Sequence, residues 1–264
     1  MRVRVYADGR LQEWISEATG PAFWAEYFSG HDVEREFETA KRGRALGDIG
    51  PILRRHLPRR GRILEAGCGL GRIVVALRSW GYDCVGVDSS TECIARARAM
   101  IPTLPVEYAD VRKLDLPDGT LAGYISLGVI EHERSGPQEF LAEARRVLKP
   151  GGVAVISVPL ANPLRRGKVR LGLHPGLPLG DPWRFHEYLY SSEQLVNFVV
   201  DAGLEVVREY DIDGGRGLSR DFRLMQRLEE FAPVLWWLIV LPFQRVGVLK
   251  SLVAHSHVVV AVKP

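Results

Sequence analysis

Apolar positions near the start of the chain recur at intervals of three to four residues, which predicts helices. Phe23, Trp24 and Tyr27 share one face at this spacing. From Arg62 onward the pattern changes, and short apolar runs alternate with longer stretches that have helical spacing. Residues 1–60 therefore predict an N-terminal helical extension ahead of a domain in which strands and helices alternate.

The alternating part predicts five strands and three helices. The expected strands are Arg62–Ala66, Asp83–Asp88, Val106–Ala109, Ala122–Leu127 and Val153–Val158. The expected helices are Gly71–Trp80, Thr91–Met100 and Pro137–Leu148. Strands that alternate with helices imply right-handed crossovers, so we expect an α/β fold with a mostly parallel sheet.

This alternation stops at Pro159, after which two insertions interrupt the chain. Residues 159–190 are rich in proline and predict a long irregular excursion above the sheet, and such a loop in a compact domain is usually functional. Residues 214–256 form the second insertion. The elements expected around and within the insertions are a helix at Ser191–Ala202, strands at Leu204–Tyr210 and His257–Val262, and helices at Arg220–Phe231 and Leu235–Leu252. We expect one domain over residues 1–264, with a core at 61–158 and a cap built from the extension and both insertions.

The composition is that of a folded globular chain, because 46% of the 264 residues are hydrophobic and 25% are charged. These values exclude a disordered tail, a collagen-like fibre and a coiled coil. Cys68, Cys84 and Cys93 are too few for a disulfide framework or a zinc site, so we expect reduced thiols in a cytoplasmic protein. No stretch reaches the roughly 18 consecutive apolar residues of a membrane span.

Three glycines, Gly67, Gly69 and Gly71, follow the first expected strand and precede the first helix of the alternating part. This arrangement indicates a tight turn where the backbone approaches a ligand. A dinucleotide-binding fingerprint has its third glycine three residues after the second, and that position is Arg72, so a nicotinamide-dependent reductase is disfavoured. Glu65, just ahead of the loop, would repel a pyrophosphate but suits a positively charged ligand group.

Two further acids stand at strand ends on the same edge of the expected sheet. Asp88 ends the second strand, where a carboxylate can accept hydrogen bonds from both hydroxyls of a ribose. Asp110 follows the third strand and can accept a hydrogen bond from an adenine amino group. Either acid alone can be a surface residue or a helix cap, but open α/β sheets bind ligands at this edge. Together with the glycine loop, they indicate a ligand site there.

These residues, in this order, resemble the class I S-adenosylmethionine-dependent methyltransferases, and among them the methyltransferase type 11 group that includes the quinone-biosynthesis methyltransferases. The resemblance covers about residues 45–212 and includes the segments Tyr124–His132 and Arg146–Gly152. It implies a Rossmann-like sheet of seven strands, mostly parallel, with an antiparallel last strand and S-adenosyl-L-methionine bound over the carboxyl edge. The residues assigned to this cofactor are Glu65, Gly67, Gly69, Asp88, Ser89, Asp110, Val111, Leu127 and Gly128.

Methyl transfer to a hydroxyl group benefits from a general base where the methyl group emerges, just past the fourth strand. His132 stands at this position and is the candidate base, with Glu131 as its candidate partner. The alternative is that His132 is structural, as a lone histidine after a strand often is. No metal is expected, because histidines and acids do not recur at ligand spacing. We expect oxygen to be the methyl-accepting atom.

The first insertion supplies candidates for the substrate site. Trp183, His186 and Tyr188 belong to an aromatic cluster that can wall a pocket, or alternatively pack as a small core under the loop. Arg165 belongs to a basic cluster that can meet a phosphate or carboxylate, unless the loop is merely solvated. The insertion carries five basic and two acidic side chains, although the net charge of the whole chain is only +3.

The longest run without a charge is Phe231–Phe243, in the second insertion. As a helix it is too short to cross a bilayer. Three alternatives stay open: a buried lid over the substrate site, a contact in a homodimer, and a peripheral membrane contact through residues 231–250. The membrane contact would suit a lipid-linked acceptor.

The sequence thus predicts a methyltransferase that acts on a small-molecule or lipid-linked acceptor. Nucleic acid is not expected as a partner, because Leu127–Ile130 lacks the Asn/Asp-Pro-Pro-aromatic sequence that grips a flipped base. The alternatives are a non-catalytic protein that binds S-adenosylmethionine, and a methyltransferase that acts on protein or nucleic acid.

Overall fold

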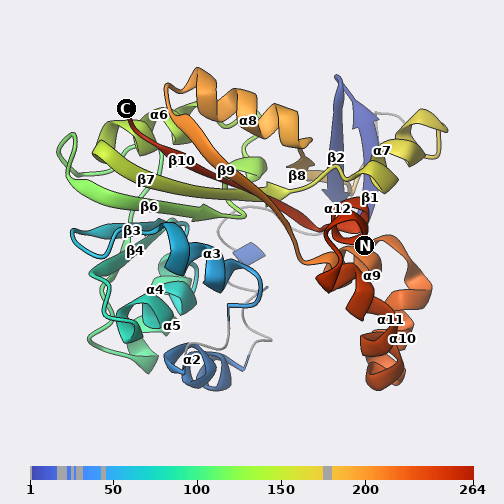
Figure 1. Ribbon diagram of the computed structural model, residues 1–264, viewed down its shortest axis with the longest axis horizontal. Helices are drawn as coiled ribbons and strands as arrows, with labels where there is room; N and C mark the ends of the chain where they lie inside the picture. Colours follow the sequence, from blue (N-terminus) through green and yellow to red (C-terminus); the bar gives the residue numbers. More distant parts are fainter. Residues whose placement is uncertain (1, 17–22, 25–26, 28–31, 43–45, 175–179) are drawn as a thin grey trace.

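The computed structural model describes residues 2–16, 23–24, 27, 32–42, 46–174 and 180–264. Of the N-terminal segment expected to be helical, most of residues 17–31 therefore lies outside the described residues. The described chain forms a seven-stranded sheet with helices on both faces. A three-stranded sheet and a group of helices from the second insertion stand at one end of it (Figure 1).

The main sheet confirms the expected fold. Its strand order is β5-β4-β3-β6-β7-β10-β9, and β10 runs antiparallel to both of its neighbours while the strands from β5 to β7 are parallel. The strands are β3 (Ile63–Ala66), β4 (Cys84–Asp88), β5 (Val106–Tyr108), β6 (Leu121–Leu127), β7 (Leu148–Pro159), β9 (Glu205–Ile212) and β10 (Ser256–Val262). The central strands are apolar along their length because both faces of the sheet are covered.

Two hydrophobic cores lie on the two faces of this sheet. Successive residues of a strand point to opposite faces. Val155 of β7 therefore belongs to the same core as Val74 of α4, while Ile156 belongs to the core that includes Leu141 of α6 and Leu195 of α8. The helices of the core are α2 (Val33–Lys41), α3 (Ile49–His56), α4 (Arg72–Ser79), α5 (Thr91–Met100), α6 (Gln138–Val147) and α8 (Ser192–Asp201).

The start of the chain corrects the prediction of an entirely helical extension. It forms an antiparallel hairpin of β1 (Arg2–Ala7) and β2 (Arg10–Ile15). Asp8 and Gly9 at its turn have φ of 52° and 71°, the left-handed values that a type I′ turn requires. An Asp-Gly pair between two runs of alternating residues is a strong hairpin signal. The prediction was wrong here because it extended the helical spacing of later residues back to the first residue.

The first insertion is more regular than expected. It contains α7 (Pro163–Arg170), which begins at the cap residue Asn162, and the strand β8 (Arg184–Leu189). β8 pairs with β2 in a second sheet of order β1-β2-β8, with Glu13 opposite Glu187. The prediction missed β8 because its pairing partner lies at the other end of the chain.

The second insertion forms four helices. They are α9 (Gly214–Asp221), α10 (Arg223–Phe231), α11 (Pro233–Arg245) and α12 (Gly247–Val253). The single helix expected at 235–252 is thus divided, and α11 and α12 meet at an angle of 108°. Among the described residues, no one helix has the length and apolar character to cross a membrane, and only this bent pair meets both criteria together. The four helices lie near the small sheet (Figure 1).

Candidate active site

A glycine loop joins β3 to α4 at the carboxyl edge of the main sheet. Gly67, Gly69 and Gly71 have φ of 80°, 52° and 77°, values that residues with a side chain rarely adopt. A Cβ atom at Gly67 would lie 2.4 Å from Cγ2 of Val129, so this position has no room for a larger residue. The loop backbone therefore passes close to the segment that follows β6.

Asp88 fixes the same loop from the neighbouring strand. Its Oδ2 accepts a hydrogen bond from the Gly69 N–H (2.7 Å), and its Oδ1 accepts one from the Ser90 N–H (2.8 Å). Ser89 lies between Asp88 and Ser90 in the sequence and is exposed at the carboxyl end of β4. Each carboxylate oxygen keeps a further lone pair, so Asp88 can also accept hydrogen bonds from the hydroxyls of a ligand.

Glu65 lies beneath the loop and is almost completely buried. Its Oε2 accepts a hydrogen bond from the Val74 N–H, in the first turn of α4, at 3.2 Å. Burial raises the pKa of Glu65 to about 8, although the Val74 N–H and the charge of Arg72 act in the opposite direction. A cationic group bound beside Glu65 would favour its ionised form, so the site suits a ligand that carries an ammonium group.

The remaining candidates for the cofactor site follow β5 and β6 along the same edge. Asp110 is hydrogen-bonded by Arg112, and these bonds lower the pKa of its carboxyl group. Val111 is buried, Leu127 is half-buried, and Gly128 is exposed with φ of 73°. All the residues that the sequence assigned to the cofactor thus lie at or just after the carboxyl ends of four neighbouring strands, where open α/β sheets bind ligands.

His132 ends a short 3-10 helix, η1 (Ile130–His132), that follows β6. Its Nδ1 lies 2.7 Å from the carbonyl oxygen of His186. A carbonyl oxygen only accepts hydrogen bonds, so Nδ1 carries the proton and Nε2 keeps its lone pair. Burial lowers the pKa of His132 to about 4, which keeps the ring neutral near pH 7. Its side chain is 20% exposed, so a ligand can reach it.

Two carboxyl groups stand beside this ring. Oε1 of Glu131 and Oε2 of Glu187 each lie 3.9 Å from Nε2 of His132. Burial, and then the nearby Glu187, raise the pKa of Glu131 well above its ordinary value, and its Oε2 has no hydrogen-bond partner among the described residues. Burial and Glu13 raise the pKa of Glu187 to about 7. The sequence identified Glu131 but missed Glu187, which reaches the site only through the pairing of β8 with β2.

The substrate candidates from the first insertion, His186, Tyr188 and Trp183, lie in different surroundings. His186 is buried next to His132, with ring centroids 4.9 Å apart, and burial together with His132 lowers its pKa to about 3. Trp24 contacts both rings, at 5.0 Å from His132 and 6.1 Å from His186 between centroids. Tyr188 is also buried, but its hydroxyl donates to the carbonyl oxygen of Arg134 (3.0 Å). Trp183 is half-buried ahead of β8.

The histidines and Glu187 also form a group that sequence spacing did not reveal. One potential ligand atom from each of His132, His186 and Glu187 lies within 4.8 Å of the others. These residues come from η1 and β8, which are far apart in the sequence. The expectation of no metal was based on local spacing and did not take account of this group.

A model of the methyltransferase domain family matches residues 64–156, the part of the chain that holds the glycine loop, Asp88 and His132. A probable S-adenosylmethionine-dependent methyltransferase from Mycolicibacterium smegmatis is 30% identical over 159 residues, or 60% of this chain and 57% of that protein. Residues 64–156 therefore belong to the methyltransferase domain family, and the chain is similar to S-adenosylmethionine-dependent methyltransferases. S-Adenosyl-L-methionine is the cofactor of this family.

Two further proteins are similar to this chain. A ubiquinone biosynthesis O-methyltransferase from Cereibacter sphaeroides is 30% identical over 158 residues, or 55% of this chain and 61% of that protein. A solved methyltransferase from Archaeoglobus fulgidus matches 92% of this chain and 99% of its own with a TM-score of 0.57, and at 18% identity this shows the shared fold. The chain spans less than two thirds of the length of both curated relatives.

Arg165, which the sequence offered as a substrate-binding residue, is not solvated, so the alternative of a merely solvated loop does not hold for it. Its side chain is wholly buried where α7 packs against the second insertion. Its Nε donates to both carboxylate oxygens of Asp221, at 3.0 and 3.1 Å, and its Nη1 donates to the carbonyl oxygen of Leu160 at 2.6 Å. Arg4 also contacts Asp221. Arg165 therefore joins the insertions to each other instead of facing a substrate.

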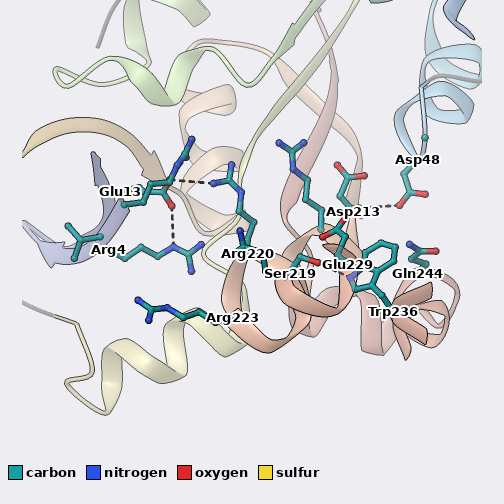
Figure 2. Close-up of a pocket in the computed structure, with 16 residues that line it drawn as sticks. Arg4, Glu13, Asp48, Asp213, Ser219, Arg220, Arg223, Glu229, Trp236 and Gln244 are labelled. Atoms are coloured by element: carbon teal, nitrogen blue, oxygen red, sulfur yellow. Dashed lines mark hydrogen bonds and ion pairs between the residues drawn. The ribbon is translucent and has the colours of Figure 1, made fainter. Parts of the chain in front are cut away.

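A cavity of about 930 Å³ lies between the small sheet and the second insertion (Figure 2). Its lining includes Arg2, Arg4 and Glu13 from the hairpin, Arg216, Arg220 and Arg223 from the insertion, and the acids Asp48, Asp213 and Glu229. The volume is within the range of small-molecule sites. Sequence reasoning missed this cavity because its walls come from the two ends of the chain.

The apolar segment of α11 is not a buried lid. Phe231, Val234 and Leu238 are 84%, 74% and 55% exposed, and the only buried residue of the helix is Val240. The prediction of a lid is therefore wrong, and the alternatives of a dimer contact or a membrane contact remain. An exposed apolar surface of this extent usually marks an interaction site.

Proposed function

We propose that this methyltransferase transfers the methyl group of S-adenosyl-L-methionine to an oxygen atom of a small-molecule or lipid-linked acceptor. The position of His132 carries the proposal. Its Nε2 has an available lone pair just past β6, and a Cβ atom on Gly128 would lie 3.5 Å from Oε1 of the adjacent Glu131. A base is therefore available next to the end of β6, where the cofactor's sulfonium is expected.

The first part of the site fits the polar end of the cofactor. Glu65 would contact the ammonium group, and Gly67 with Gly69 would lie along the methionine end. Asp88, with Ser89, would hold the ribose hydroxyls. The fit rests on the positive φ angles of the loop and on the hydrogen bond from Gly69 to Asp88, which hold the backbone open for a ligand.

The second part of the site fits the adenine and the reacting end. Asp110 and Val111 would hold the adenine, and Leu127 and Gly128 would line the sulfonium side. The cofactor supplies an electrophilic methyl group on a good leaving group, so the protein contributes mainly by positioning the acceptor. Exclusion of water by the buried groups around His132 would strengthen every electrostatic contact there.

His132 would accept the proton of the acceptor hydroxyl at Nε2. The hydrogen bond from Nδ1 to the carbonyl of His186 would hold the ring in place and stabilise the imidazolium that forms. An ionised Glu187, 3.9 Å away, would add to this stabilisation. The base can act without a metal ion. We therefore expect EDTA to leave turnover unchanged, although His132, His186 and Glu187 lie close enough together to bind a metal ion.

The rival function is binding of S-adenosylmethionine without methyl transfer, and one experiment separates the two. The protein and trideuteromethyl-labelled cofactor would be incubated with a metabolite extract from a strain that lacks this protein. We expect one compound to gain a CD₃ group at oxygen, and a compound lighter by one methyl group to accumulate in the deletion strain. Cofactor binding with no labelled product in the small-molecule, lipid, protein or nucleic-acid fractions would contradict the proposal.

We also propose a cytoplasmic location and no nucleic-acid partner. Cys68, Cys84 and Cys93 are all unpaired and buried, which suits a reducing compartment. Label in the small-molecule or lipid fraction alone would agree with this proposal, whereas label in RNA or DNA would contradict it.

A further inference from the structure

One end of the cavity carries more positive than negative charge. Glu13, 3% exposed, is the common partner of Arg2, Arg4 and Arg220, at 2.5, 3.4 and 3.7 Å. Figure 2 shows Glu13 between Arg4 and Arg220, with Arg223 below them. Arg223 is exposed and forms no ion pair with any described residue. Two carboxylates, Glu13 and the Asp221 that also contacts Arg4, thus stand against the guanidinium groups of Arg2, Arg4, Arg220 and Arg223. An anionic group of a ligand would add a partner for this excess of guanidinium groups.

A nearby histidine also lies in the field of these arginines. Burial and then Arg216, Arg165, Arg220 and Arg4 lower the pKa of His255 well below its ordinary value. These guanidinium groups therefore act together on a buried neighbouring side chain.

The opposite end of the cavity is acidic. Asp48, Asp213 and Glu229 lie there, beside Gln244 (Figure 2). Asp48 accepts hydrogen bonds from Lys250 Nζ at 3.1 Å and from the Asp213 N–H at 3.2 Å. These acceptors suit hydroxyl groups of a ligand whose acidic group is held at the arginine end.

The helix α11, which forms part of the cavity wall, exposes apolar side chains to solvent on its other side. Trp236 lines the cavity and its Nε1 donates to Oγ of Ser219 at 2.9 Å, whereas the next residue, Trp237, is 48% exposed. Phe231, Val234 and Leu238 continue the exposed apolar surface, which we call the α11 surface. Arg227 and Arg245 flank this surface in the sequence, and both are exposed. An insertion that lines a charged cavity on one side and exposes apolar groups on the other matches an amphiphilic ligand.

We propose that the arginine end of the cavity binds the phosphate, pyrophosphate or carboxylate group of a membrane-borne lipid acceptor, and that the α11 surface rests in the membrane that carries this lipid. The proposal depends on the proposed function for the role of the ligand as methyl acceptor. The cavity is connected to the candidate base through its lining residue Glu13 on β2, which is paired with Glu187 on β8. Oε2 of Glu187 lies 3.9 Å from Nε2 of His132.

The cavity is tested with dodecyl phosphate below its micelle concentration, inorganic phosphate, and the uncharged dodecanol. Binding is followed by calorimetry in the full chain. We expect dodecyl phosphate to bind more tightly than either other probe, and Arg223→Gln to weaken it about tenfold or more, because a charge-assisted contact is lost. Arg170→Gln, an exposed arginine at the end of α7, is the matched control and should have no effect. Equal weakening in both variants, or no binding of dodecyl phosphate, would overturn the proposal.

The α11 surface is tested by flotation with vesicles of phosphatidylcholine alone or mixed with phosphatidylglycerol. We expect flotation with the anionic vesicles, a loss of at least tenfold in Val234→Glu and Leu238→Glu, and no loss in Val200→Glu, which places the same charge on α8. Thermal unfolding and cofactor binding would show that each variant is folded. Absence of flotation, or a homodimer that Val234→Glu dissociates, would overturn the proposal. A failure of methyl transfer alone would overturn only the proposed function, because neither binding experiment involves the cofactor's methyl group.

Discussion

Two regions of this chain are assembled in different ways. One is the carboxyl edge of the main sheet, proposed to bind the cofactor and called the cofactor edge here. The other, called the acceptor side, comprises His132 and the cavity proposed to bind the acceptor. At the cofactor edge, contacts join residues that are near one another in the sequence, such as Gly69 with Asp88 and Glu65 with Val74. On the acceptor side, Glu13 meets Arg220 and the backbone of His186 orients His132. The cofactor edge is therefore specified locally, whereas the acceptor side exists only when distant parts of the chain have come together.

The two regions also differ in charge. Glu65, Asp88 and Asp110 supply carboxylates at the cofactor edge, which suits a cationic donor with hydroxyl and amino groups. The cavity places guanidinium groups around the buried acid Glu13, and one of them, Arg4, also contacts the buried Asp221. If this contrast reflects function, substitutions in one region should leave the ligand of the other region largely unaffected.

The largest expected effect comes from His132→Ala, which acts where the two regions meet. Loss of the base should lower kcat about 10²–10⁴-fold, while the Kd of the cofactor stays unchanged because the cofactor edge is intact. Single-turnover kinetics and calorimetry would measure the two quantities. His56→Ala, on α3, removes a half-buried histidine that is hydrogen-bonded to Tyr210 and should leave kcat unchanged. An unaltered kcat in His132→Ala would remove this residue from the mechanism.

The next largest effect concerns the assembly of the acceptor side. Asp221→Ala leaves Arg4 and the buried Arg165 without their shared partner, and should lower the free energy of unfolding by about 3–5 kcal/mol. The exposed pair of Asp181 with Arg184 is the control, where Asp181→Ala should cost about 0–1 kcal/mol. Chemical denaturation would measure both values.

The buried ion pair of Asp221 with Arg165 determines the direction in which the free energy of unfolding changes with pH. Although burial acts in the opposite direction, Arg165 and Arg4 hold the pKa of Asp221 below its ordinary value. Its contribution is therefore present above the unfolded pKa, about 3.9, and is lost as the pH falls through the lower folded value. If the free energy of unfolding falls equally steeply toward low pH in the wild type and in Asp221→Ala, this assignment is contradicted.

A smaller effect is expected from Asp88→Ala at the cofactor edge. The variant loses the acceptor of the Gly69 N–H and the expected bonds to the ribose, so the Kd of S-adenosylmethionine should rise about 10²-fold. Binding of dodecyl phosphate should not change. Asp83→Ala, an exposed acid just before the same strand, is the control. A parallel loss of both ligands in Asp88→Ala would mean that the two regions are not independent.

The smallest effect is a change of cofactor affinity with pH. The pKa of Glu65 is about 8 without a cationic ligand, and a bound ammonium group would lower it. Binding should therefore release a proton, and affinity should rise by up to about tenfold per pH unit between pH 6 and 7.5. In Glu65→Gln this rise should disappear. Calorimetry in buffers with different ionisation enthalpies would count the proton, and the same slope in both proteins would contradict the assignment.

The comparison also explains how much the sequence could predict. The strands and glycines of the cofactor edge were predicted with boundaries accurate to a few residues, because periodicity, caps and turns are local signals. Glu187 and β8 were missed because their roles depend on pairing between β2 and β8, and Arg220 was missed because its partner Glu13 lies at the other end of the chain. Arg165 was misplaced for a related reason: its charge was evident in the sequence, but its partner Asp221 was in another insertion.

The position of β10 has a consequence for biosynthesis. This last strand enters between β7 and β9 and pairs with both along its length. Until Ser256–Val262 leaves the ribosome, each of these strands presents an open edge that can pair with another chain. The second insertion is made just before β10, so its exposed apolar helices and two unpaired strands coexist for a time. A chaperone that shields nascent chains should therefore matter most for this protein during synthesis of its last third.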